Sequence, residues 1–139
     1  MGWSVAPFGL KELKAKTIRV LMRGSDLPSM RNQTVRVEIV NANVLKERHD
    51  VIVRFMKAYR ETLDWMYSNP QAVKDYAQSM HMDESLVELQ RSEFNPKEAL
   101  NPDQLSDVDL VMEDAIAGKF LEKPLTKEQL AEFIQIPPR

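Results

Sequence analysis

The sequence contains no cysteine and only four glycines among its 139 residues. Without cysteine, disulfides, thiolate nucleophiles and cysteine-bound metals are excluded. The scarcity of glycine leaves few positions for tight backbone turns around a phosphate, and no glycine-rich phosphate loop, dinucleotide fingerprint or nucleophile elbow occurs. The sequence therefore lacks the short motifs by which nucleotide-binding enzymes and common hydrolases are recognised.

The chain also lacks an excess of positive charge and a long apolar run. Its formal net charge is -2, so a role in binding a nucleic-acid backbone is not indicated. No apolar stretch approaches the roughly 18 residues that a membrane span requires, and residues 1–6 show no signal-peptide pattern. We expect no membrane insertion, and a cytoplasmic protein if Met1 is the true start.

What the chain does contain is typical of a folded domain. Its residues are 43% hydrophobic and 29% charged, which allows a buried core. Within residues 1–41, apolar and polar side chains alternate in two stretches, Thr17–Arg23 and Thr34–Asn41. Alternation of this kind predicts strands with one face toward solvent. The turn cluster Gly24–Pro28 separates the two stretches.

Residues 42–139 show helical periodicity instead. A long amphipathic helix is predicted after Asp50, with Ile52, Phe55, Met56, Tyr59, Leu63 and Met66 recurring at helical spacing. Helix starts are predicted at Asn41 or Asn43, at Asn69-Pro70, Asp83, Asn101-Pro102 and Thr126, with Gly118 as a stop. The prediction is an α/β, helix-dominated domain with two short strands and five or six helices. Residues 1–41 form its strand-containing segment and residues 42–139 its helical segment.

Four motifs occur along the chain in a particular order. They are Trp3-Ser4-Val5-Ala6-Pro7-Phe8, Gly24-Ser25-Asp26-Leu27-Pro28, Glu47-Arg48-His49-Asp50-Val51 and Ser68-Asn69-Pro70-Gln71-Ala72-Val73. This order resembles the C-terminal portion of the substrate-binding proteins of ABC importers. The resemblance is to the nitrate, sulfonate and taurine branch, which includes binders of the thiamine-pyrimidine precursor.

The resemblance implies part of one lobe of a type II periplasmic-binding-protein fold. It also implies a periplasmic protein that binds a small organic or anionic solute and partners an ABC permease. The chain covers only the last part of such receptors, so we expect a truncated relative whose solute binding is weak or lost. Two departures stand out. No proline follows His49, and Arg36 and Glu38 charge one face of a strand that is apolar in intact receptors.

The same resemblance assigns ligand-binding candidates near the N-terminus. Trp3, Pro7 and Phe8 lie in the stretch that borders the ligand cleft of the receptors, and aromatic walls suit small organic ligands. The alternative is that Trp3 and Phe8 anchor the N-terminal segment to the helical core. Both interpretations stay open from the sequence alone.

Other candidates for chemistry are structural in our interpretation. His49 and His81 are the only histidines, and neither has the spacing of a zinc-binding helix. Glu113 and Asp114 are adjacent, so a helix points them apart rather than across a substrate. We therefore expect no enzyme activity, no metal and no cofactor.

A second hypothesis concerns assembly. A partial lobe leaves apolar surface and strand edges uncovered, and a second copy of the chain is a ready partner for both. The alternative function is therefore a homo-oligomeric interaction protein without ligand binding. We expect a homodimer, in which the copies exchange or share strands.

Overall fold

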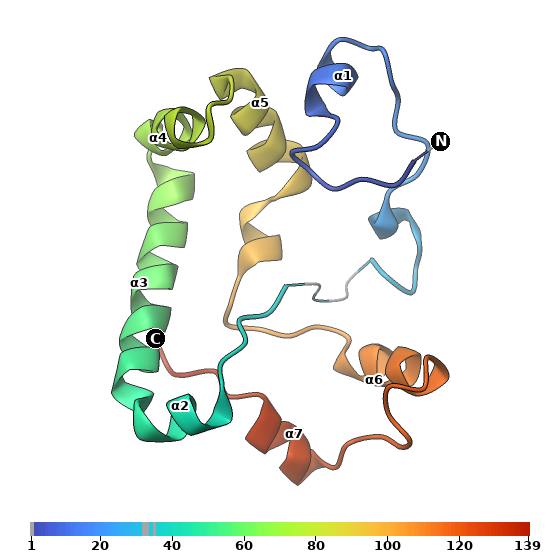
Figure 1. Cartoon of the computed structure of the whole chain (residues 1–139), viewed down its shortest axis with the longest axis vertical. Coiled ribbons are helices and arrows are strands. Elements are labelled where there is room, and N and C mark those ends of the chain that lie inside the picture. The colour runs from blue at the N-terminus through green and yellow to red at the C-terminus, as the bar shows by residue number, and fades with distance from the viewer. Residues whose placement is uncertain (1, 32–33, 35) are drawn as a thin grey trace. The chain divides into compact units, whose positions relative to one another are not determined.

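The computed structural model describes residues 2–31, 34 and 36–139, and all regular structure within them is helical (Figure 1). The α-helices are α1 (Leu10–Lys14), α2 (Ala42–Glu47), α3 (His49–Ser68), α4 (Gln71–Met80), α5 (Glu84–Leu89), α6 (Val108–Ala117) and α7 (Lys127–Phe133). Short 3-10 turns are η1 (Gly24–Asp26) and η3 (Lys97–Leu100), and η2 (Gln90–Phe94) is a π-helical turn that continues α5. The helix-dominated prediction is confirmed.

The two predicted strands are wrong for the part of the chain that the structure describes. Neither Thr17–Arg23 nor the described residues of 34–41 are in a strand; Val35 lies outside the described residues. A strand exists only when its backbone is paired with a neighbour, and an isolated pair is marginal in water. Each stretch has the alternating apolar and polar side chains of a strand, but no described strand pairs with its backbone. The α/β class is accordingly corrected to all-helical for the described residues.

Most predicted helix ends are confirmed because they rest on local hydrogen bonds. The side chain of Asn41 accepts from the Asn43 amide at 2.9 Å, and that of Asn69 accepts from the Gln71 amide at 2.9 Å. Thr126 and Gln129 form a capping box at the start of α7, and Gly118 follows the last residue of α6. The start predicted at Asn101-Pro102 is wrong, because α6 begins only at Val108.

The chain divides into two compact units. Unit 1 comprises Met1–Met22 and Lys57–Asn101, and unit 2 comprises Arg23–Met56 and Pro102–Arg139. Helix α3 contributes its first residues to unit 2 and the remainder to unit 1. The division at residue 41 into a strand-containing and a helical segment stays a prediction.

Unit 1 holds a small core. Its buried apolar side chains come from four helices, α1, α3, α4 and α5: Leu10, Leu63, Ala72, Val73, Ala77, Leu86 and Val87. Val73, Ala77 and Val87 pack as one cluster, with Met82 against it. The i, i+4 spacing of Val73 and Ala77 places both on one face of α4, and that face packs against α5. This packing fixes the α4–α5 hairpin and the start of η2.

Unit 2 has almost no core of its own. Met56 is the single buried residue among its described residues. The apolar stripe predicted for α6, which includes Val108, Met112 and Ile116, is only half-buried. Thr34 is joined to Ser106 by two hydrogen bonds, including one of 2.8 Å from the Ser106 amide to the Thr34 hydroxyl. Hydrogen bonds, more than apolar burial, therefore hold the described parts of unit 2.

Candidate functional site

The N-terminal turn presents its aromatic residues to solvent. Trp3 is 90% exposed and Phe8 is 75% exposed, whereas Pro7 is half-buried. The Phe8 amide donates to the Val5 carbonyl at 3.0 Å, and the Ser4 hydroxyl donates to the Phe8 carbonyl at 3.3 Å. These bonds close a turn that directs no aromatic ring into the core. The assignment of Trp3, Pro7 and Phe8 to ligand binding stays a prediction.

Burial next to this turn falls on Leu10 instead. Gly9 has φ of 81°, a left-handed conformation that is costly for residues with a Cβ. It bends the chain into α1, where Leu10 is 3% exposed and the Lys14 ammonium donates to the Ser85 hydroxyl on α5 at 2.5 Å. Anchoring therefore comes from α1, which leaves Trp3 and Phe8 available on the surface.

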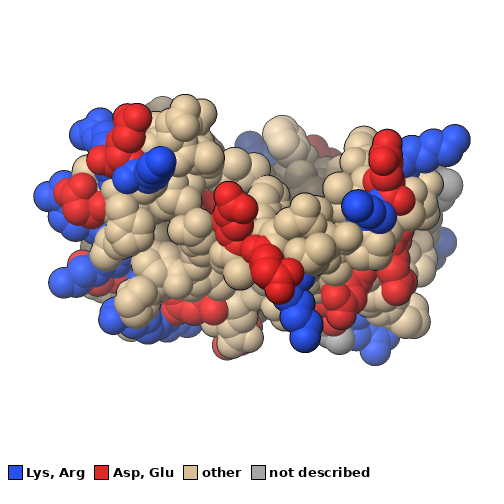
Figure 2. Space-filling view, turned by 90° about the horizontal axis from the view of Figure 1, so that it is seen from below, with Lys and Arg blue, Asp and Glu red and all other residues tan. Residues whose placement is uncertain are grey.

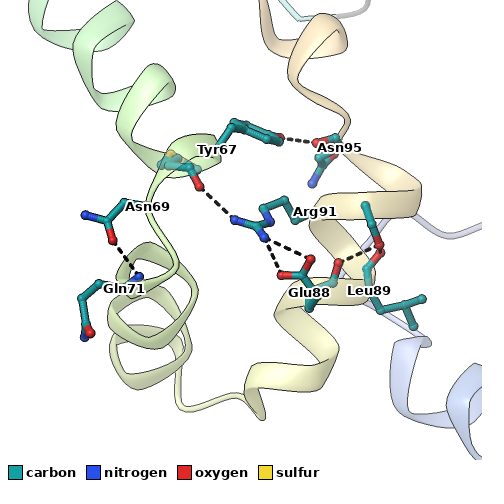
Figure 3. Close-up of polar contacts among 9 residues, drawn as sticks. Tyr67, Asn69, Gln71, Glu88, Leu89, Arg91 and Asn95 are labelled. Carbon is teal, nitrogen blue, oxygen red and sulfur yellow. Dashed lines mark hydrogen bonds and ion pairs between the residues drawn. The ribbon is translucent and has the colours of Figure 1, made fainter.

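A polar cluster joins the end of α3 to η2 within unit 1 (Figure 3). The Arg91 guanidinium donates to the Met66 carbonyl at 3.1 Å and pairs with the Glu88 carboxylate at 2.8 Å. The Tyr67 hydroxyl donates to the Asn95 carbonyl. A cation is favourable at carbonyls near a helix C-terminus, where the helix dipole is negative. The cluster ties two elements together.

Sequence reasoning did not identify this cluster. Arg91 and Tyr67 lie 24 positions apart, and no local pattern connects them. The same is true of Lys97, whose ammonium lies 2.6 Å from the Asp64 carboxylate on α3. The contacts of Arg91 with Met66, of Tyr67 with Asn95 and of Lys97 with Asp64 are between α3 and the segment after α5. Their chemistry is that of structural ion pairs and hydrogen bonds.

Unit 2 contains one shallow groove at the junction of α2 and α3. Its volume is about 230 Å³, and it is lined by Leu45, His49, Ile52, Val53 and residues 135–138. Typical small-molecule pockets begin near 300 Å³. The lining is mainly aliphatic and proline, with one imidazole and one amide. The predicted ligand residues Trp3, Pro7 and Phe8 belong to unit 1 and are not among its lining residues.

The histidines and acidic residues form no metal centre in the described part of the chain. No group of three or more histidine, aspartate or glutamate side chains is placed to hold a metal ion there. His49 begins α3 and borders the groove, and His81 follows α4 in a left-handed conformation. Each histidine thus lies at a helix end.

Charge is distributed without a large patch of one sign on the face shown in Figure 2. Acidic and basic side chains are interspersed, partly as the helix-surface pairs Asp50–Arg54 and Glu61–Lys57. The pKa of Glu128 is lowered because its carboxylate accepts hydrogen bonds from its own backbone amide and from the Thr126 hydroxyl. Glu128 lies in the first turn of α7, where negative charge is favourable.

The four sequence motifs coincide with turns and helix junctions. Trp3–Phe8 forms the N-terminal turn, and Gly24–Asp26 forms η1. Arg48 separates α2 from α3, and Asn69-Pro70 separates α3 from α4. No family model, curated protein or solved structure matches this chain. Among the described residues, no helix has both the length and the apolar character that a bilayer crossing requires.

Proposed function

We propose that this chain is a relative of the substrate-binding proteins of ABC importers and corresponds to their C-terminal helical portion. The observation that carries the proposal is the continuous run from α2 to α4. A short helix ends at Glu47, a 20-residue helix follows from His49 to Ser68, and Asn69-Pro70 opens the next helix. This order of helices agrees with the order of the sequence motifs, and it supports the proposal.

The exposed stretches support the same proposal. Ile18, Leu21 and Met22 are 50%, 63% and 65% exposed, and Ile39 is 89% exposed. In a receptor lobe such residues would lie in paired strands of a sheet covered on both faces. If the neighbouring strands of such a lobe are absent, the apolar side chains of the remaining strand-like segments are left exposed.

The proposed ligand is a small sulfonate, nitrate or pyrimidine, contacted by Trp3, Pro7 and Phe8. Trp3 and Phe8 are exposed and Pro7 is half-buried, so we expect the chain alone to contribute one wall of a cleft. Binding by this chain is therefore weak or lost. The proposal also places the protein in the periplasm with an ABC permease as its partner, and it includes no enzymatic activity.

Thermal unfolding with taurine, an alkanesulfonate, nitrate and a pyrimidine tests the ligand part of the proposal. We expect millimolar ligand to shift the melting temperature by about 1 °C or less, because a ligand far below its dissociation constant adds little stability. Any shift should disappear in Trp3→Ala and persist in the control Phe133→Ala, which alters an exposed aromatic of unit 2. A shift that survives Trp3→Ala would contradict the proposed site. Micromolar binding by the chain alone would contradict weak binding.

The second candidate function is homo-oligomeric interaction without ligand binding. A specific observation favours it: the described residues of unit 2 include one buried side chain, whereas Ile39, Phe120 and Phe133 are 89%, 85% and 79% exposed. Soluble monomers rarely leave many large apolar side chains uncovered, and such surfaces mark protein contacts. Light scattering at micromolar concentration should give the mass of a dimer. A monomer mass would exclude this candidate.

A further inference from the structure

Residues 36–40 lie outside the helices and turns that the structure describes. The segment runs as coil into α2 (Figure 1), and Val37 and Ile39 are 57% and 89% exposed. The backbone groups of Val37–Val40 form no hydrogen bond with another described residue. The segment therefore combines accessible backbone groups with exposed β-branched side chains, which are the requirements for adding a strand.

The sequence of this segment is complementary to itself. In an antiparallel pair of two identical strands centred on Val37, Arg36 of each copy lies opposite Glu38 of the other. Val37 lies opposite Val37, and Val37 and Ile39 of both copies share one face. Opposite charges facing each other across an antiparallel pair are stabilising, and like charges are destabilising. Two Arg36–Glu38 pairs therefore lie on either side of the Val37–Val37 contact, and the two-fold axis relates one pair to the other.

The other exposed strand-patterned stretch provides a contrast. In residues 17–23, an antiparallel self-pair centred on Leu21 would place Arg19 of each copy opposite Arg23 of the other. That register brings two pairs of like charges together. Both stretches have exposed apolar side chains, so exposure alone does not select between them. Residues 17–23 contain no acidic side chain that could face Arg19 or Arg23, whereas residues 36–40 carry one arginine and one glutamate at positions that face each other in a two-fold pair.

We propose that a second copy of this chain binds at residues 36–40 and forms an antiparallel two-stranded ribbon in which Val37 faces Val37 across a two-fold axis. The proposal rests on the homo-oligomeric function proposed above and names its contact. A two-stranded ribbon is marginal by itself, so exposed apolar side chains of unit 2 from the two copies must cover its apolar face. The ribbon supplies the register, and the apolar side chains supply most of the burial.

Single cysteines test the register directly, because the chain has none of its own. Val37→Cys places two sulfurs on directly opposite residues, whose Cβ atoms are about 4.5–5.5 Å apart and close to disulfide distance. Ile39→Cys is the matched control. In the same register the two residues 39 are offset by four positions, or about 13 Å. Under mild oxidation Val37→Cys should form a covalent dimer at micromolar concentration, and Ile39→Cys should remain non-covalent.

Charge reversal tests the same contact without chemistry on sulfur. Glu38→Arg and Arg36→Glu each create two like-charge pairs, so each should weaken dimerisation about tenfold or more. The double variant Arg36→Glu with Glu38→Arg restores opposite charges and should recover wild-type affinity. Both positions are exposed, and unchanged far-ultraviolet circular dichroism verifies that the helices remain.

The outcomes separate this inference from the function on which it rests. A monomer at all concentrations overturns both. A dimer in which Val37→Cys fails to cross-link, or in which the double charge variant is no better than the single variants, overturns the register and leaves the homo-oligomeric function standing. Efficient cross-linking through Ile39→Cys would indicate a different register and likewise overturn the proposal.

Discussion

Unit 1 and unit 2 are of similar length but differ in what holds them together. Unit 1 buries seven apolar side chains from four helices, whereas Met56 is the one buried residue among those described in unit 2. Both sequences contain amphipathic helical stripes, so periodicity does not explain the difference. The difference is that α4 and α5 have each other as partners, while the apolar stripes of α6 and α7 remain at most half-buried. An amphipathic helix is stabilised only when its apolar face finds a neighbour.

The largest test of this comparison removes a core side chain from unit 1. Leu86 is 1% exposed on α5, and Leu86→Ala should lower the free energy of unfolding by about 3 kcal/mol through lost burial and a residual cavity. The matched change in unit 2, Phe133→Ala, should cost about 0.5 kcal/mol or less because the ring is exposed. Urea unfolding followed by far-ultraviolet circular dichroism, which reports the helices of both units, measures both. Equal effects would mean that the cores of the two units do not differ.

The next test concerns the polar cluster of unit 1. Arg91→Met keeps the aliphatic stem but removes the contacts with the Met66 carbonyl and the Glu88 carboxylate, so it should cost about 2 kcal/mol. The control is Arg54→Met in unit 2. Its ion pair with Asp50 is on the helix surface, and its loss should cost about 0.5 kcal/mol or less. If both variants unfold at the same urea concentration, Arg91 does not tie α3 to η2.

A third test uses the capping box of α7, where unit 2 depends on local structure. Thr126→Ala removes the acceptor for the Gln129 amide and should destabilise α7 by about 1 kcal/mol. Hydrogen exchange should report faster exchange in α7 and unchanged exchange in α4 and α5. Thr126→Ser retains the hydroxyl and should retain most of the protection. Loss of protection throughout unit 1 would contradict the independence of the two regions.

The smallest expected effect is the pH dependence of α7. The pKa of Glu128 is lowered in the folded chain by the hydrogen bonds to its carboxylate, so the unfolded chain binds that proton more tightly. The stabilisation is complete at neutral pH and is lost as the pH falls through the folded-state pKa of this carboxyl. Exchange of α7 amides, corrected for intrinsic rates, should therefore lose protection in acid. Glu128→Gln should remove this contribution and flatten the profile.

The predicted ligand residues and the polar contacts around Arg91 differ in how much of them a sequence can reveal. Trp3, Pro7 and Phe8 were assigned by resemblance, and their local turn is present, but a ligand cleft requires surfaces from distant segments. The contacts of Arg91 and Lys97 were not predicted, because they join residues brought together only by the return of the chain from α5. Burial of Arg60, which is 6% exposed, also contradicts the usual position of arginine at a surface.

The sequence by itself determined several of the helix ends, although the start predicted at Asn101-Pro102 is wrong. Asn41, Asn69-Pro70, Thr126–Gln129 and Gly118 act on backbone groups within a few residues, so their effect does not depend on the rest of the fold. Tertiary structure alone decided which apolar residues are buried. Leu63 and Phe55 lie in the same α3 stripe, yet Leu63 is buried and Phe55 is half exposed. The tertiary structure also explains why the two predicted strands are missing from the described residues. Alternating side chains favour an extended backbone, but a strand forms only when a neighbouring strand pairs with its backbone hydrogen-bonding groups.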